Sequence, residues 1–140
     1  MKNIYEVFDE FEEADGKKAK MAVIEKNLSQ TLVQVLELAF HPTHEWLIDD
    51  IPVEYKIPHT LPGISPCQLS TEIRKLYLFK KGHPSAEQLT PEKRKQLLLQ
   101  LIESIEPREA EVVGGILRKD LGVKGLNYKF VKEAFPDMLP

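Results

Sequence analysis

The residues with the clearest chemical potential lie near the C-terminus, in a Gly-x-x-Gly loop between two predicted helices. Gly122 and Gly125 bracket this loop, Lys124 lies within it, and Asn127 precedes the second helix as a capping residue. Backbone N–H groups at such a loop lack an intrahelical partner and should point outward at one spot, which suits an anion. Further cations lie within a few turns of the loop, namely Arg118, Lys119, Lys129 and Lys132. The pattern predicts a site for phosphate, either free or in a nucleic-acid backbone.

The same residues also have a purely structural interpretation. A glycine after a helix, followed by an asparagine cap, is how ordinary helical hairpins turn. Lysines on solvated helix faces are common in any globular protein. The residues alone leave both interpretations open.

No catalytic motif accompanies the loop. The sequence lacks Gly-x-Ser-x-Gly, Gly-x-x-x-x-Gly-Lys-[Ser/Thr] and His-Glu-x-x-His. The acid pairs Glu12-Glu13 and Asp49-Asp50 are adjacent, so on regular structure their side chains point in different directions. The histidines between residues 41 and 59 lack metal-ligand spacing, and the single Cys67 excludes an internal disulfide. We therefore expect no enzymatic activity, no metal and no cofactor.

Composition and charge indicate one folded domain with an uneven charge distribution. The 140 residues are 42% apolar and 29% charged, which fits one folded domain spanning residues 1–140. No apolar run approaches the roughly 20 residues of a membrane span, so a cytoplasmic location is expected. Residues 1–60 hold 6 Lys/Arg and 12 Asp/Glu, whereas residues 61–140 hold 13 and 10. The C-terminal part is therefore basic, which is compatible with a DNA-facing side in one part of the fold.

Hydrophobic periodicity predicts an all-α fold of six or seven helices. Leu28 and Tyr77 are expected to face inward, and the glycine pair at 114–115 inside a helix is better explained by a close neighbouring helix than by an approaching nucleic-acid backbone. The expected helices cover approximately residues 3–14, 17–27, 29–41, 65–82, 90–105, 107–121 and 128–135. Lys17, Lys18 and Lys20 are expected on the outward, solvated face of their helix. The cations Arg74, Lys75, Lys80 and Lys81 also lie outside the apolar stripe; they are candidates for phosphate contacts, although a solvated face is the favoured interpretation.

A proline-rich segment at residues 41–66 interrupts the helices. We expect an ordered crossing loop, with one helical turn at residues 45–49 and an extended piece at residues 53–57. Trp46 and Tyr55 are expected to anchor it in the core rather than to stack on bases.

The sequence at residues 112–123, Val-Val-Gly-Gly-Ile-Leu-Arg-Lys-Asp-Leu-Gly-Val, resembles the end of the N-terminal DNA-binding domain of ATP-dependent DNA ligases of the bacteriophage type. In that family an Arg/Lys-Asp-Leu triplet closes a long helix, and a glycine-containing turn leads into a short helix ending in a proline step, here residues 130–136. Residues 17–27 and 32–40 are similar to the family's second and third helices, and residues 55–57 fit its crossing loop.

The resemblance implies a domain that lies across the minor groove of double-stranded DNA, intact or nicked, and holds the backbone with little sequence reading. It places the contact loop by position on Arg118, Lys119, Gly122, Lys124, Gly125 and Asn127, with Lys129 beside them. Asp120 would repel phosphate and is expected to cap the turn.

The departures from the family pattern also have consequences. The adenylation motif Lys-x-Asp-Gly is missing, because Asp15-Gly16 follows Glu13 and Ala14, and the chain ends about where the nucleotidyltransferase domain would begin. We expect no ligation and no ATP binding. The expected partners are DNA and either a ligase catalytic domain or a replication protein, in a bacterial or phage-infected cell.

A second hypothesis is a helical protein-interaction module of a replication or transcription complex, which keeps the ligase-domain fold without binding DNA. Its acidic N-terminal half would then dock the partner. A basic cluster around Lys124 favours DNA, whereas an exposed apolar patch elsewhere favours a protein partner.

Overall fold

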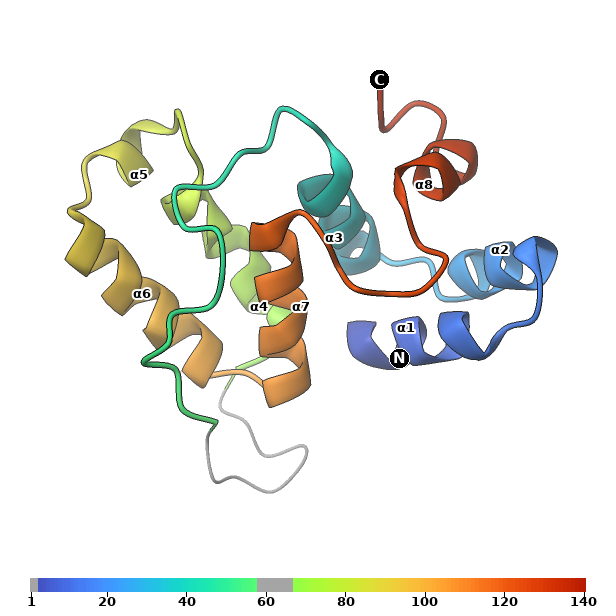
Figure 1. Cartoon of the computed structure of the whole chain (residues 1–140), viewed down its shortest axis with the longest axis horizontal. Helices are drawn as coiled ribbons and strands as arrows, with labels where there is room; N and C mark the ends of the chain where they lie inside the picture. Colours follow the sequence, from blue (N-terminus) through green and yellow to red (C-terminus); the bar gives the residue numbers. More distant parts are fainter. Residues whose placement is uncertain (1–2, 58–66) are drawn as a thin grey trace.

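The structure is a computed structural model that describes residues 3–57 and 67–140, and its regular structure over these residues is helical (Figure 1). This confirms the all-α class. An isolated antiparallel bridge between Trp46 and Lys80 is the nearest approach to a strand in the described residues. The helices are α1 (Ile4–Glu13), α2 (Lys17–Lys26), α3 (Gln30–Phe40), α4 (Leu69–Glu72), the 3-10 helix η1 (Ile73–Phe79), α5 (Pro84–Glu87), α6 (Pro91–Glu103), α7 (Pro107–Arg118) and α8 (Tyr128–Ala134).

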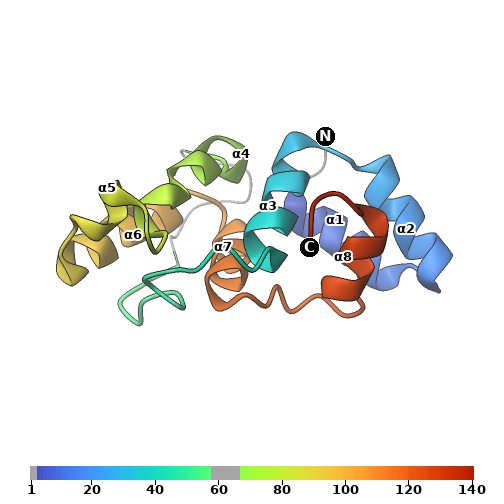
Figure 2. The same ribbon diagram turned by 90° about the horizontal axis from the view of Figure 1, so that it is seen from above.

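Helix α7 lies in the middle of the molecule. In both views α1, α2, α3 and α8 lie on one side of it, and α5 and α6 lie on the other (Figures 1 and 2). It contacts α1, α3 and α6. Because it has neighbours on both sides, α7 is buried along most of its length, including the polar Glu109.

Local capping explains where several helices begin. The Ser29 hydroxyl accepts a hydrogen bond from Leu32 N at 3.1 Å, and the Thr90 hydroxyl accepts one from Lys93 N at 3.1 Å. At α1 the Glu6 carboxylate accepts a hydrogen bond from the N–H of Asn3 at 3.1 Å. These bonds satisfy N–H groups that the first helical turn leaves free, and they confirm three helix starts expected from the sequence.

The segment at residues 67–82 differs from the single α-helix expected. One turn of α4 continues into the 3-10 helix η1, which has about three residues per turn. Ile73, Leu76 and Phe79 are therefore stacked on one buried face. The same geometry turns Tyr77 outward, where it is 45% exposed, so its predicted inward position was wrong.

Two further expectations were wrong or incomplete. Leu28 is 56% exposed because it follows the end of α2, which buries Val23 and Ile24 instead. Helix α5 was missed because four residues are too few for a periodic pattern; His83-Pro84, with proline at the first helical position, was the signal that could have located it.

The glycine pair in α7 is explained by close packing, but not against a neighbouring helix as expected. A Cβ on Gly114 would lie 2.8 Å from Cδ1 of Ile51 in the crossing loop. A Cβ on Gly115 would lie 2.9 Å from Cα of Leu121, where the chain leaves α7 and passes back along it. The glycines therefore fix the paths of two connecting segments.

The described part of the crossing loop is held by backbone hydrogen bonds to the end of η1. Leu47 N donates to Phe79 O at 2.8 Å, and Lys81 N donates to Glu45 O at 2.8 Å. Trp46 and Tyr55 pack against the core as expected. Residues 45–49 form no helical turn, and residues 53–57 begin with a turn instead of an extended piece, so both predictions were wrong. His59 and the expected helix start at residues 65–66 lie outside the described residues.

His44, near the start of this loop, lies among several charged groups. Its Nε2 is 3.8 Å from a carboxylate oxygen of Glu37, and its ring contacts that of His41 with centroids 5.5 Å apart. Burial lowers the pKa of His44 below its ordinary value of 6.5, and the charges of Lys80, His41 and Lys119 lower it further, whereas Glu37 raises it.

No helix in the described residues is long and apolar enough to cross a bilayer.

The glycine pair predicts unequal effects of alanine. Gly115→Ala places a methyl group against the Leu121 backbone, which cannot move without shifting the chain, and should lower the free energy of unfolding by about 1–3 kcal/mol. Gly114→Ala meets side-chain atoms of Ile51 and Arg118, which can shift more readily than a backbone, so it should destabilise the protein less than Gly115→Ala. Urea denaturation measures both, and equal effects would contradict this packing.

The half-buried His44 predicts a pH dependence of stability. Below about pH 6.5 the unfolded chain takes up a proton that folded His44 resists, so the free energy of unfolding should fall as the pH is lowered. His44→Gln should flatten that slope between about pH 7.5 and pH 5.5. Denaturant titrations across this range give the slopes, and an unchanged slope in the variant would exclude His44 as the titrating group.

Candidate nucleic-acid interface

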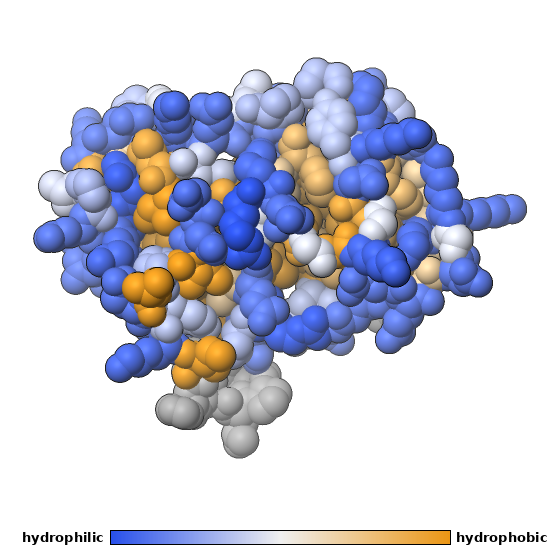
Figure 3. Space-filling model, in the orientation of Figure 1, coloured by the Kyte–Doolittle hydropathy of each residue, from blue (hydrophilic) through white to orange (hydrophobic). Residues whose placement is uncertain are grey.

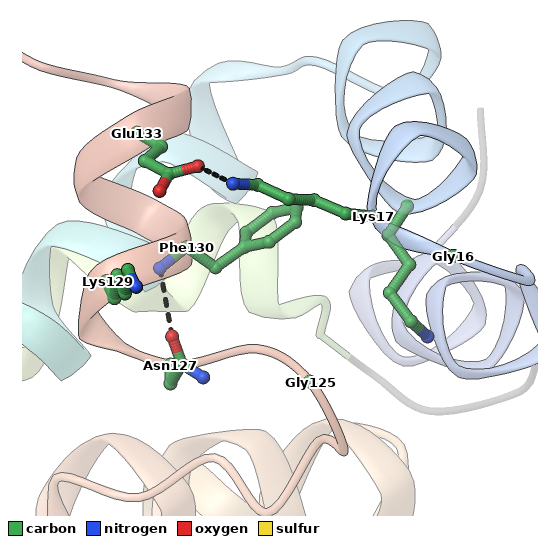
Figure 4. Close-up of a pocket in the computed structure, with 8 residues that line it drawn as sticks. Gly16, Lys17, Gly125, Asn127, Lys129, Phe130 and Glu133 are labelled. Carbon is green, nitrogen blue, oxygen red and sulfur yellow. Dashed lines mark hydrogen bonds and ion pairs between the residues drawn. The ribbon is translucent and has the colours of Figure 1, made fainter.

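A pocket of about 350 Å³ lies where α2, α8 and the loop between α7 and α8 meet (Figure 4). Its lining joins three of the predicted site residues, Gly125, Asn127 and Lys129, with two lysines of α2. We call it the α2–α8 pocket. It is lined by Gly16, Lys17, Lys20, Gly125, Asn127, Lys129, Phe130 and Glu133.

The aromatic ring of Phe11 contacts two residues that line this pocket, Phe130 and Lys20. It is fully buried and meets the ring of Phe130 edge to face, with centroids 5.0 Å apart. Lys20 Nζ lies 4.8 Å from the centroid of the Phe11 ring and donates a hydrogen bond to the Phe11 carbonyl at 2.7 Å. The ring therefore fixes α8 and the Lys20 side chain relative to α1.

Gly125 brings the loop close to α2. Its φ of +86° is a conformation that residues with a side chain rarely adopt. An added Cβ would also lie 3.4 Å from Cε of Lys20 and 3.7 Å from the Phe11 ring. Backbone conformation and close approach both select glycine here, which agrees with the structural interpretation of the loop.

The charged groups of the pocket are unequally paired. Lys17 forms an ion pair with Glu133, and this bond holds the pKa of the Glu133 carboxyl below its usual range (Figure 4). Lys129 is exposed and forms no ion pair with the residues that the structure describes. With three lysines and one glutamate in its lining, the pocket carries a net charge of about +2.

Asn127 has two functions that follow from its amide. Its side-chain oxygen accepts a hydrogen bond from Phe130 N at 2.9 Å, which confirms the predicted cap of α8. Its side-chain nitrogen has no hydrogen-bond partner among residues 3–57 and 67–140, and it lies on the side of Gly125 (Figure 4). The amide can therefore donate to a ligand in the pocket.

Lys119 is turned away from this pocket. Its Nζ donates to the carbonyl oxygens of Leu38 at 3.0 Å and His41 at 2.8 Å, so it satisfies the last carbonyls of α3. Burial lowers its pKa. Lys119 also takes the left-handed conformation at the end of α7, with φ of 60°, a position that the sequence interpretation gave to a glycine.

The remaining predicted residues lie elsewhere along the loop. Arg118 is paired with Asp50 at 2.7 Å and, with Gly122, lines a separate hollow beside α1. This pairing lowers the pKa of the Asp50 carboxyl. The Lys124 side chain is exposed. The structure therefore does not bring all seven predicted residues to one spot.

Two loop amides expected to be free are bonded to carboxylates of the chain itself. Gly122 N donates to Asp120 Oδ1 at 3.0 Å, which is the capping role expected for Asp120. Lys124 N donates to a carboxylate oxygen of Glu12 at 3.0 Å. The expected convergence of free N–H groups was wrong at these two positions, because acidic residues of the same chain occupy them.

Sequence reasoning missed Lys17 and Lys20 as site residues. Both were assigned to a solvated face, and more than 100 residues separate them from the loop they meet. Gly16 followed by lysines at 17, 18 and 20 was the available signal, but only the fold relates it to residues 125–133. Among the described residues, no group of three or more His, Cys, Asp or Glu side chains is arranged to hold a metal.

These features define an all-helical protein with a lysine-lined pocket. The sequence profile of DUF6433, a family of unknown function, matches residues 7–123, and the chain belongs to this family. The matched region begins within α1 and ends within the loop, so it includes most of α1 and all of α2 to α7 but not α8. A search of curated proteins gave no match.

The two hydrogen bonds of Lys119 predict a structural effect of its loss. Lys119→Met keeps the aliphatic stem but leaves two α3 carbonyls without their partner, so the free energy of unfolding should fall by about 1–3 kcal/mol. Lys124→Met changes an exposed side chain and should stay within about 0.5 kcal/mol of the wild type. Thermal and urea denaturation compare the two, and equal stabilities would contradict the assigned role of Lys119.

Proposed function

We propose that this protein is a duplex DNA-binding module that holds the phosphate backbone, without reading sequence, at the α2–α8 pocket. The observation that carries the proposal is the convergence of Lys17, Lys20 and Lys129 with the free amide nitrogen of Asn127. Lysine ammonium groups and an amide donor recognise phosphate oxygens irrespective of the base attached. The similarity of residues 112–123 to the ligase domain supports the same function.

The charge distribution between α1 and α2 supports this orientation of the DNA. Helix α1 contains five acidic and no basic residues, whereas α2 contains four lysines and one glutamate. A phosphate backbone is repelled by the α1 surface and attracted by the start of α2. The backbone should therefore follow α2 and α8 and avoid the hollow beside α1, where Arg118 lies.

Glu133 has a defined part in this proposal. Its carboxylate pairs with Lys17 in the free protein, so a phosphate group must compete with it for that lysine. Lys129 has no such competitor among the described residues. Removing the negative charge at 133 should therefore strengthen DNA binding, because it releases Lys17 and raises the positive charge of the pocket.

The module would bind DNA without chemistry of its own. The adenylation motif of ligases is absent from the sequence, and no residue pair in the α2–α8 pocket is arranged as nucleophile and base. If a ligase catalytic domain or a replication protein acts on the same DNA, this protein would hold the duplex for it.

A protein-interaction function has one observation in its favour. Val53 is 95% exposed and Ile57 is 65% exposed, both in the crossing loop and away from the α2–α8 pocket. Figure 3 shows hydrophobic surface on that side of the molecule. Exposed apolar side chains away from the basic pocket are the feature expected of a protein-binding surface, although a binding patch usually covers several hundred Å².

The test is a fluorescence-anisotropy titration of intact and nicked duplexes at two or more salt concentrations. Lys129→Gln should weaken binding to all sequences alike and reduce the salt slope by about 0.9 per lost phosphate contact. Glu133→Gln should tighten binding. Lys93→Gln, an exposed lysine at the start of α6, is the matched control and should change neither quantity.

The outcomes separate the two functions. If the wild type binds DNA and neither Lys129→Gln nor Glu133→Gln changes that binding, the α2–α8 pocket is rejected as the interface. No salt-sensitive binding to either duplex at low salt would reject the DNA-binding function and favour a protein partner at the Val53 and Ile57 surface.

A further inference from the structure

We propose a second binding site, between α3, the crossing loop and η1, for a nucleobase that carries a phosphate. The pocket there has a volume of about 230 Å³ and is separate from the α2–α8 pocket in its lining residues. This is smaller than the roughly 300–1,000 Å³ of sites for drug-sized ligands and suits a single base. The proposal goes beyond duplex binding and does not depend on it.

An aromatic side chain and two cations of the η1 region line this pocket. With about three residues per turn, Arg74 and Tyr77 lie one turn apart on one side of η1, and Lys80 follows directly after its last residue; all three line the pocket. In a regular α-helix, residues at this spacing would step around an arc of about 120° instead of forming a straight row. Exposed aromatic rings beside cations are the combination that binds unpaired nucleotides, because the ring stacks on the base and the cations attract the phosphate.

Tyr77 is positioned to serve as the stacking platform. It is 45% exposed, and its ring contacts the ring of His83 with centroids 5.0 Å apart. This contact restrains the tyrosine without covering it. Trp46 lies in the same pocket lining, half-buried against the core, and supplies a second aromatic wall.

Two polar atoms of pocket residues are left without partners. Trp46 Nε1 and His44 Nδ1 are buried and have no hydrogen-bond partner among the described residues. Buried polar groups in proteins are nearly always satisfied, so these atoms mark a place where a further donor or acceptor belongs. The edge of a base offers both kinds of group.

The charged groups around the pocket are compatible with a phosphorylated base. Lys80 forms no ion pair with the residues that the structure describes, and its charge is felt at His44. Arg74 is exposed and lies near Glu72. Glu37 is the acidic member of the lining, and its carboxylate can accept a hydrogen bond from an exocyclic amino group.

The test uses Trp46, the only tryptophan of the sequence, as a reporter inside the proposed site. The full chain is titrated with deoxyadenosine monophosphate, with single-stranded oligodeoxyadenylate and with inorganic phosphate, while tryptophan fluorescence is recorded. Saturable quenching by the nucleotide or the oligonucleotide, but not by phosphate, is the expected result. Quenching by the mononucleotide identifies a free nucleotide as a sufficient ligand, and quenching by the oligonucleotide alone identifies an unpaired residue of a strand.

Variants then assign the contacts. Tyr77→Leu should weaken binding by about tenfold or more, because stacking on the ring is lost, whereas Tyr77→Phe should retain it. Lys80→Gln should weaken nucleotide binding and reduce its salt dependence. Lys129→Gln, in the other pocket, should leave the quenching unchanged, which separates this site from the proposed duplex interface.

Absence of saturable quenching by both nucleotide ligands would overturn the proposal. Equal affinities of wild type and Tyr77→Leu would also overturn it, because Tyr77 is exposed and its replacement should leave the fold intact.

Discussion

The contacts of Phe11 are the constraint on which the candidate interface depends. This buried ring meets Phe130 of α8, lies beneath the ammonium group of Lys20 in α2, and sits 3.7 Å from the place that a Cβ on Gly125 would occupy. Its carbonyl also accepts a hydrogen bond from Lys20. One residue of α1 thus contacts a helix, a lysine and a loop that lie far apart in sequence, and these contacts hold Lys20 beside the segment that carries Lys129.

The paths of the connecting segments are set by a second constraint, the close packing along α7. Gly114 and Gly115 admit Ile51 of the crossing loop and Leu121 of the loop that follows. Lys119, in the left-handed conformation, ends α7 and bonds to the last carbonyls of α3. The loop that carries Gly122 and Gly125 is thereby directed toward α2, while the carboxylates of Asp120 and Glu12 satisfy two of its amides.

The helices were largely predictable from sequence, because apolar spacing and capping residues such as Ser29, Thr90 and Asn127 act locally. The switch to 3-10 winding in η1 was not, since Ile73, Leu76 and Phe79 fit either a short α-helix or a 3-10 helix until their packing is known. Of the seven predicted site residues, Gly125, Asn127 and Lys129 line the α2–α8 pocket, and the presence of Lys17 and Lys20 beside them depends on tertiary contacts that the sequence does not reveal. Lys119 was predicted to contact phosphate because it lies in a basic segment. Its amine instead donates hydrogen bonds to the carbonyl oxygens of Leu38 and His41, and no sequence pattern indicates those bonds.

The most direct test of the central claim is an NMR titration of the ¹⁵N-labelled chain with a nicked duplex, in which every backbone amide reports separately. The account predicts that the amides with the largest shift changes cluster at residues 16–20 and 125–133, the two segments that line the α2–α8 pocket. Shift changes concentrated at residues 50–57 of the crossing loop, or none at low salt, would contradict it.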